Sequence, residues 1–151
     1  MNPAGKVPPL LDALVALHVA ALPGWTVTDG PWDGNYDALA GDVVYVGSAG
    51  GNESESVQVT EEHLPGLSGR TAQRVEVFCD ISSWSGDGAQ KPLRDRLAGA
   101  VGAVAEAIQA DNTLGGLCAD ARMNVSAWRA GAGNGNALVT VSYSVAARLL
   151  G

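Results

Sequence analysis

The pattern that most constrains the fold of this chain is a strict alternation of residue types around position 143. One face of the segment is apolar and the other carries short, mostly hydroxyl-bearing side chains: Val139, Val141, Tyr143 and Val145 against Thr140, Ser142, Ser144 and Ala146. A period of two is the signature of a β-strand that buries one face. We therefore expect a strand over 137–149 that lies against the core.

Other segments favour strands as well. Residues 73–81 alternate with Val75, Val77, Cys79 and Ile81 on one face, whereas 42–46 form a short apolar run that predicts a buried strand. A short strand is expected over 25–28. Residues 122–128 alternate, with Trp128 predicted on the face opposite Val125. The glycine and asparagine residues of 131–136 predict a hairpin turn between the last two strands.

Two segments have helical periodicity instead. Residues 8–22 repeat leucine at spacings of three and four, and Pro23-Gly24 is expected to end that helix. Residues 91–110 place one apolar stripe on a helix, formed by Leu93, Leu97, Val101, Val104 and Ile108. Alanine residues beside the stripe keep this second helix slim, which suits close packing on a sheet.

These elements predict an α+β fold with a single antiparallel or mixed β-sheet covered on one face by two helices. A chain of 151 residues suits one domain, so we assign 1–151 to a single unit. Within it, 48–72 is expected to be a long, flexible acidic loop between strands, in which Val57 and Val59 allow a short exposed strand. Residues 82–90 are predicted to form a serine- and glycine-rich loop that holds Trp84.

The formal net charge of −7 argues against nonspecific DNA binding, which requires a basic face. No segment has the length of a membrane span or the pattern of a signal peptide, so we expect a soluble protein that is not exported. The two cysteines, Cys79 and Cys118, are too few for a disulfide framework and indicate a reducing cytoplasm.

No set of residues indicates catalysis, a cofactor or a metal. His18 lies beside the apolar stripe of the first helix and is interpreted as a partly buried packing residue, and His63 beside Glu61 and Glu62 is a weak metal pattern. Cys79 falls on an apolar strand face without an evident base, so we expect an inert thiol. The glycine run 131–135 lacks the lysine of a phosphate-binding loop and leads into a strand.

Contacts with other subunits are the remaining candidates for function. Trp84 and Trp128 are predicted at strand ends or loops, where large aromatic side chains either cap the core edge or anchor protein–protein contacts. Together with the loop 48–72 they define the predicted oligomer or partner interface: Glu53, Glu55, Val57, Arg70, Trp84 and Trp128.

The order of elements and turns resembles the tail terminator proteins of siphophages, especially those of phages that infect actinobacteria. The resemblance covers nearly the whole chain and rests on these segments: the helix with Leu10-Leu11-Asp12-Ala13-Leu14, Pro23-Gly24, Val27 to Pro31, Val43 to Gly47, Arg74 to Val77, Ala110 to Gly116, and the closing hairpin with 137–149. It implies a virion protein that forms a hexameric ring on the head-proximal end of the tail and is assembled in the host cytoplasm.

Such a ring would end polymerisation of the tail tube and join it to head-completion or connector proteins. The partners implied are therefore copies of the chain itself, the major tail tube protein and a connector protein. DNA would pass through the lumen without specific binding, which fits the acidic charge. No cofactor, metal or catalytic residue is implied.

Three alternatives stay open. A head-completion, neck or tail-tube protein would also form rings, but a tube protein polymerises into filaments. A small thiol enzyme would show rapid, selective labelling of Cys79. A free-standing binding module would be a strict monomer in solution.

Overall fold

The structure is a computed structural model that describes residues 3–30, 41–47, 57–63, 71–133 and 135–150. A 3₁₀ turn, Pro3–Lys6, leads into the first helix. The helices are α1 (Val7–Ala21) and α2 (Lys91–Ala110). The strands are β1 (Thr26–Asp29), β2 (Asp42–Val46), β3 (Val57–His63), β4 (Thr71–Ser85), β5 (Asp120–Gly133) and β6 (Asn136–Leu150).

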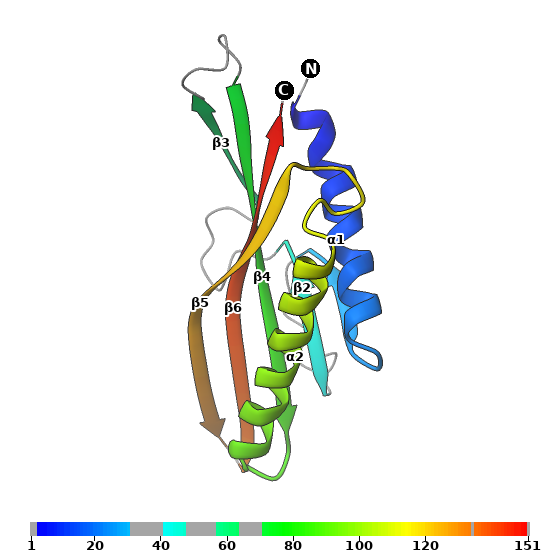
Figure 1. Ribbon diagram of the computed structural model, residues 1–151. Helices are drawn as coiled ribbons and strands as arrows, with labels where there is room; N and C mark the ends of the chain where they lie inside the picture. The colour runs from blue at the N-terminus through cyan, green and yellow to red at the C-terminus, as the bar shows by residue number, and fades with distance from the viewer. Residues whose placement is uncertain (1–2, 31–40, 48–56, 64–70, 134, 151) are drawn as a thin grey trace.

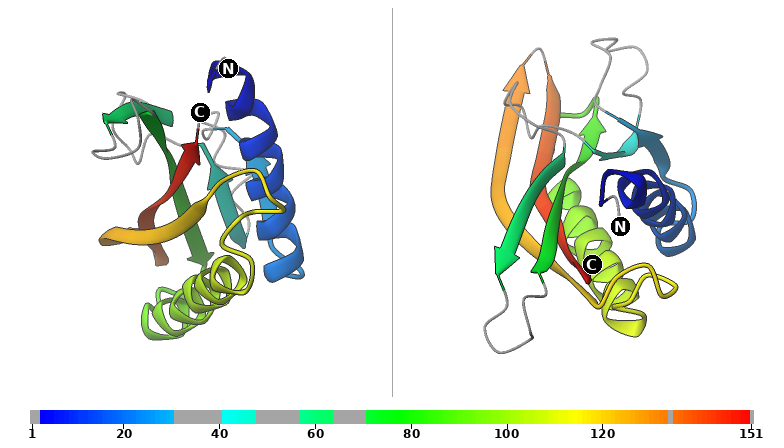
Figure 2. Two further views of the ribbon diagram at one scale, coloured as in Figure 1. Left: turned by 45° about the horizontal axis from the view of Figure 1, so that its top comes forward. Right: turned by 90° about the horizontal axis from the view of Figure 1, so that it is seen from above.

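All described strands belong to one mixed sheet. Its order is β1-β2-β4-β6-β5, and β3 pairs with the N-terminal half of β4. Only β1 and β2 run parallel, whereas every other pair is antiparallel. Both helices lie on one side of the strongly twisted sheet, as Figures 1 and 2 show. The predicted fold class is therefore confirmed, with the mixed form of the sheet.

The core lies between the helices and the sheet face that they cover, called here the inner face. β4 and β6 contribute their odd-numbered apolar residues to this face, so the predicted faces of 73–81 and 137–149 are confirmed. The main buried side chains are Leu10 and Leu14 of α1, Leu93, Leu97, Val104 and Ile108 of α2, and Val44, Val77, Ile81, Val141, Tyr143 and Val145 of the sheet. The opposite side of the sheet, called here the outer face, carries the polar residues of the same strands.

The prediction of one long loop over 48–72 is wrong in its continuity, whereas the short strand that Val57 and Val59 allow is present. Val57–His63 forms β3, and β4 already begins at Thr71. Seven residue pairs join β3 to β4, and Val57 and Val59 lie opposite the buried Val77 and Val75. The apolar alternation therefore outweighs the polar composition around it. Residues 48–56 and 64–70 lie outside the described residues.

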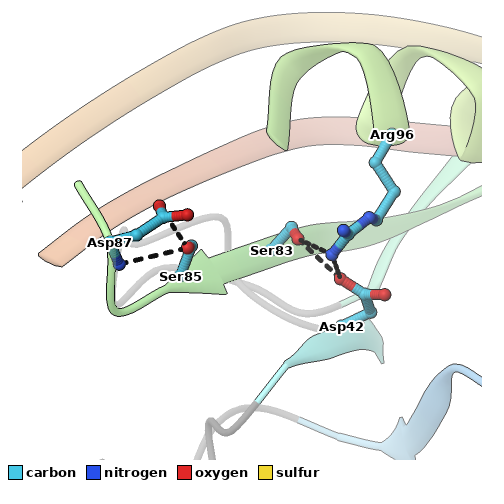
Figure 3. A network of polar contacts seen from close by, with 5 residues as sticks. All are labelled: Asp42, Ser83, Ser85, Asp87 and Arg96. Atoms are coloured by element: carbon cyan, nitrogen blue, oxygen red, sulfur yellow. Dashed lines mark hydrogen bonds and ion pairs between the residues drawn. The ribbon is translucent and has the colours of Figure 1, made fainter. Parts of the chain in front are cut away.

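The predicted loop 82–90 is also too long. β4 continues to Ser85, and Ser82 and Ser83 are buried between β2 and β6. A serine side chain is short enough to pack there, and its hydroxyl can be buried because it has a hydrogen-bond partner. The Ser82 hydroxyl lies 2.9 Å from that of Thr140 on the neighbouring strand. Trp84 therefore belongs to the strand. The true turn begins after Ser85, whose hydroxyl donates to Asp87 at 2.6 Å (Figure 3).

A polar contact fastens α2 to the sheet beside this turn (Figure 3). Ser83 is fully buried and donates its hydroxyl to Asp42 at 2.5 Å, and Arg96 of α2 contacts the same carboxylate oxygen at 3.1 Å. The Arg96 side chain is 49% exposed and the Asp42 side chain is 23% exposed. Water therefore competes for the ion pair but not for the serine.

We expect Asp42→Ala to cost more stability than Arg96→Ala. The aspartate variant leaves a buried hydroxyl without its acceptor, a loss of about 1–3 kcal/mol. The arginine variant removes a half-exposed ion pair worth at most about 1 kcal/mol. Urea unfolding of both variants checks the order, and equal losses would show that the ion pair carries the contact.

The alternation of β5 is interrupted by a bulge. Val125 pairs with Tyr143 but Ala127 pairs with Ser142, so Ser126 is an extra residue between them. The bulge moves Trp128 to the inner side of the sheet, opposite Val141. The prediction that Trp128 faces away from Val125 is therefore wrong, because an unbroken period of two was assumed.

Candidate functional site

A polar cluster lies inside the core between α1 and β6. His18 and Tyr143 are buried, and the Tyr143 hydroxyl lies 2.6 Å from Nε2 of His18. Nδ1 of the same ring lies 2.7 Å from the Leu14 carbonyl oxygen, which can only accept. Nδ1 therefore carries the proton, and the tyrosine donates to Nε2. The sequence interpretation of His18 as a packing residue is confirmed, with deeper burial than expected.

Burial controls the ionisation of this cluster. It lowers the pKa of His18, against which the hydrogen bond to the Leu14 carbonyl acts. It raises the pKa of Cys79 to about 12, and it raises that of Tyr143 well above its ordinary value, helped by the nearby Cys79 and Asp80. All three groups are neutral at pH 7. A thiol held in this form is a poor nucleophile, and the cluster is suited to fastening the helix to the sheet.

Both cysteines are expected to react slowly in the native protein. Cys79 and Cys118 are free and buried, and the pKa of Cys118 is raised to about 11 by burial and by nearby aspartates. Titration with a chromogenic disulfide should release little thiolate until urea is added, when both thiols should react. Rapid labelling of Cys79 in the folded state would instead favour the thiol-enzyme alternative.

The outer face holds a polar network across three strands. Ser142 of β6 donates to Asp80 of β4 at 2.6 Å and accepts from Arg129 of β5 at 2.6 Å. One position along, Ser144 donates to Glu76 at 2.9 Å. Because the serine donates to a carboxylate and receives from a guanidinium, its hydroxyl is oriented but not deprotonated. The network stabilises the register of the sheet and does not activate a nucleophile.

β5 forms one border of the sheet and exposes apolar side chains. Among the described strands its only partner is β6. Val125 and Trp128 flank the bulge on the inner side of the sheet, where α2 does not cover them, and they are 42% and 48% exposed. Arg122 of the same strand is also exposed but lies on the outer face, opposite Ala146. Exposed large apolar residues on an open sheet border are typical of a contact between proteins.

The other end of the sheet exposes different residues. β1 lies there beside α1, away from the C-terminal half of β5 (Figure 1). Asp12 and Val19 are exposed on one side of this helix, seven residues apart, and Val19 is 56% exposed. Asp29 at the end of β1 is exposed as well. One exposed valine and two exposed aspartates of α1 and β1 thus differ from the apolar residues exposed on β5.

The predicted interface residues do not form one patch. Val57 is half-buried at the start of β3, Trp84 is 38% exposed on the outer face, and Trp128 lies on the inner side of β5. Glu53, Glu55 and Arg70 lie outside the described residues. The structure thus separates the two tryptophans by the thickness of the sheet.

The sequence analysis missed two sets of residues. It did not single out Val19 and Asp12, although their spacing of seven on a helix that is otherwise apolar was visible. It also missed that Arg74, Arg122 and Arg148 converge on the outer face, which depends on the pairing of three strands.

The described residues contain no group of three or more histidine, cysteine, aspartate or glutamate residues that could hold a metal ion. In the same part of the chain, neither helix has the length and hydropathy needed to cross a membrane. The sequence matches no protein-family model, and no curated protein matches it.

Proposed function

We propose that this chain is a structural subunit that assembles head to tail into a closed ring and serves as the terminator of a phage tail tube. The observation that carries the proposal is the border strand β5, which presents Val125 and Trp128 beside its bulge. The assignment to a tail rests on the resemblance in element order.

Side-chain character and position support a contact between unlike surfaces. The β5 border offers the apolar Val125 and Trp128 on the inner side of the sheet, whereas α1 offers Val19 and Asp12. β1, which packs beside α1, and β5 lie at opposite ends of the strand order (Figure 1). A contact between two different surfaces repeats with each added copy and closes when the rotation between copies divides a full turn. This arrangement favours a ring over a symmetric dimer.

The experiment is to measure the mass and the shape of the purified protein. Native mass measurement and negative-stain electron microscopy are expected to show closed rings of one copy number, and the resemblance implies six subunits. Filaments would indicate a tail-tube protein. A strict monomer, both alone and with polymerised tail tubes, would contradict the proposal.

Gene order gives an independent check on the tail assignment. A terminator gene is expected between the connector genes and the gene of the major tail tube protein. A gene among metabolic genes of a host would refute the assignment to a phage tail, although the ring itself would still be tested by its mass.

A further inference from the structure

The strand register places like charges side by side at one end of the outer face. Arg74 of β4 is directly opposite Arg148 of β6, and Asp120 of β5 is opposite the other side of Arg148. One row further, Arg122 is opposite Ala146 on the same face. Two like charges directly opposite each other destabilise a sheet. The fold nevertheless places three arginines and one aspartate in two neighbouring rows of this face.

These side chains surround a small cavity. Its volume is about 80 Å³, and it is lined by Arg74, Asp120, Arg122, Ala146, Ala147 and Arg148. Sites for drug-sized ligands occupy roughly 300–1,000 Å³. The cavity therefore suits a compact group of a few atoms. The small side chain of Ala146 leaves the space between the arginines open.

The described residues that line the cavity include three arginines and one acid. Glu76 lies on the same face opposite Ala146 and accepts a hydrogen bond from Ser144. Asp120 contacts Arg148 at 3.9 Å, and both side chains are more than one third exposed. Arg74 and Arg122 are exposed and have no ion pair within the described part of the chain. Three of the nine lysine and arginine residues thus meet here, although the whole chain has a net charge of −7.

The number of donors identifies the ligand class. A guanidinium presents a planar fork of N–H groups that matches two oxygens of a carboxylate or phosphate. One fork already satisfies a carboxylate, whereas three forks around one point suit a group with several charged oxygens. We infer that the cavity of Arg74, Arg122 and Arg148 binds a single phosphate-type oxyanion. The acidic remainder of the chain disfavours an extended track along nucleic acid.

The first experiment is titration of the full chain with inorganic phosphate at constant ionic strength, followed by calorimetry and by amide chemical shifts. We expect saturable binding that the double variant Arg74→Gln/Arg122→Gln weakens roughly tenfold or more, because charge-assisted hydrogen bonds are lost. The matched control is Lys91→Gln/Arg94→Gln on α2, which removes the same charge from exposed positions and should leave binding unchanged. No saturable binding, or equal losses in both double variants, would overturn the inference.

A second variant tests the site in the opposite direction. Asp120→Asn removes the one carboxylate among the described residues that line the cavity and should tighten phosphate binding several-fold. Unchanged or weaker binding in this variant, with the fold intact by circular dichroism, would show that the cavity does not hold an anion beside Asp120 and would overturn the inference.

Competition identifies the source of the phosphate. A short DNA duplex without terminal phosphates displaces inorganic phosphate when the site takes a backbone phosphate, and the expectation that DNA passes without binding would then be wrong. Absence of displacement identifies free phosphate or a small phosphorylated molecule as the ligand. The inference does not depend on ring formation, because phosphate binding and assembly mass are read separately.

Discussion

Trp128→Ala is expected to dissociate the proposed ring into smaller species. A half-exposed tryptophan at the centre of a contact contributes roughly 2–4 kcal/mol to association, which corresponds to a loss of affinity of about thirtyfold or more. The subunit itself should keep its stability, because the side chain is 48% exposed and lies outside the buried core. Sedimentation velocity over a range of concentrations measures the change, and circular dichroism checks the fold.

The matched control is Trp84→Ala. Trp84 is also an exposed tryptophan on a long strand, but it lies on the outer face. It should leave the assembly unchanged when the contact uses the β5 border. Equal losses of assembly in both variants would contradict this placement and would indicate that both tryptophans belong to the interface.

Mixing experiments separate a head-to-tail contact from a symmetric one. Val19→Asp should weaken assembly from the α1 side as Trp128→Ala does from the β5 side. In a head-to-tail contact, the intact β5 border of the first variant fits the intact α1 surface of the second. A mixture should therefore form a dimer that neither variant forms alone, and its absence would argue against unlike surfaces.

Lowering the pH from 7 to 5 is expected to destabilise the folded subunit through His18. Burial lowers the pKa of this histidine below 6.5, its value in the unfolded chain. Between these two values the unfolded state binds a proton that the folded state does not. The contribution of the neutral histidine to the free energy of unfolding is therefore complete above pH 6.5. It falls by up to about 1.4 kcal/mol per pH unit as the pH drops toward the pKa of the folded state.

Urea unfolding at several pH values measures this loss, with His18→Gln as the comparison. Glutamine keeps a polar side chain of similar length but does not titrate, so the variant should have a flatter profile between pH 7 and 5. Parallel pH profiles for the parent and the glutamine variant would assign the acid sensitivity to other groups.

Tyr143→Phe tests the same contact at pH 7. The variant leaves Nε2 of His18 without its hydrogen-bond donor, at a cost of about 1–3 kcal/mol in the free energy of unfolding.

The helices and the inner faces of the strands could be predicted from local patterns. α2 begins at Lys91 and ends at Ala110, as its apolar stripe and Pro92 indicate. β2 likewise has its predicted bounds. Cys79 was placed correctly on the buried face because period two depends only on neighbours along the chain.

The features that depend on pairing could not be predicted in this way. The bulge at Ser126 adds one residue to β5, and only its pairing with β6 reveals it. The arginine cavity could be predicted only from the registers of β4, β5 and β6 together. The alternation along β4 shows that Arg74, Glu76 and Asp80 share one face, but it does not show which residues of β6 and β5 lie beside them. The partnership of His18 with Tyr143 joins residues 125 positions apart, and no local pattern encodes such a distance.

The extra residue in β5 also limits what can dock on that strand. A straight border of 14 residues would offer an uninterrupted template to any extended peptide, including misfolded copies of the same chain. Ser126 shifts the alternation of amide and carbonyl groups in the middle of the strand. An incoming strand that pairs in register with Asp120–Val125 is therefore out of register after Ser126. Growth by strand addition is thereby discouraged, and recognition is left to the shape of the side chains.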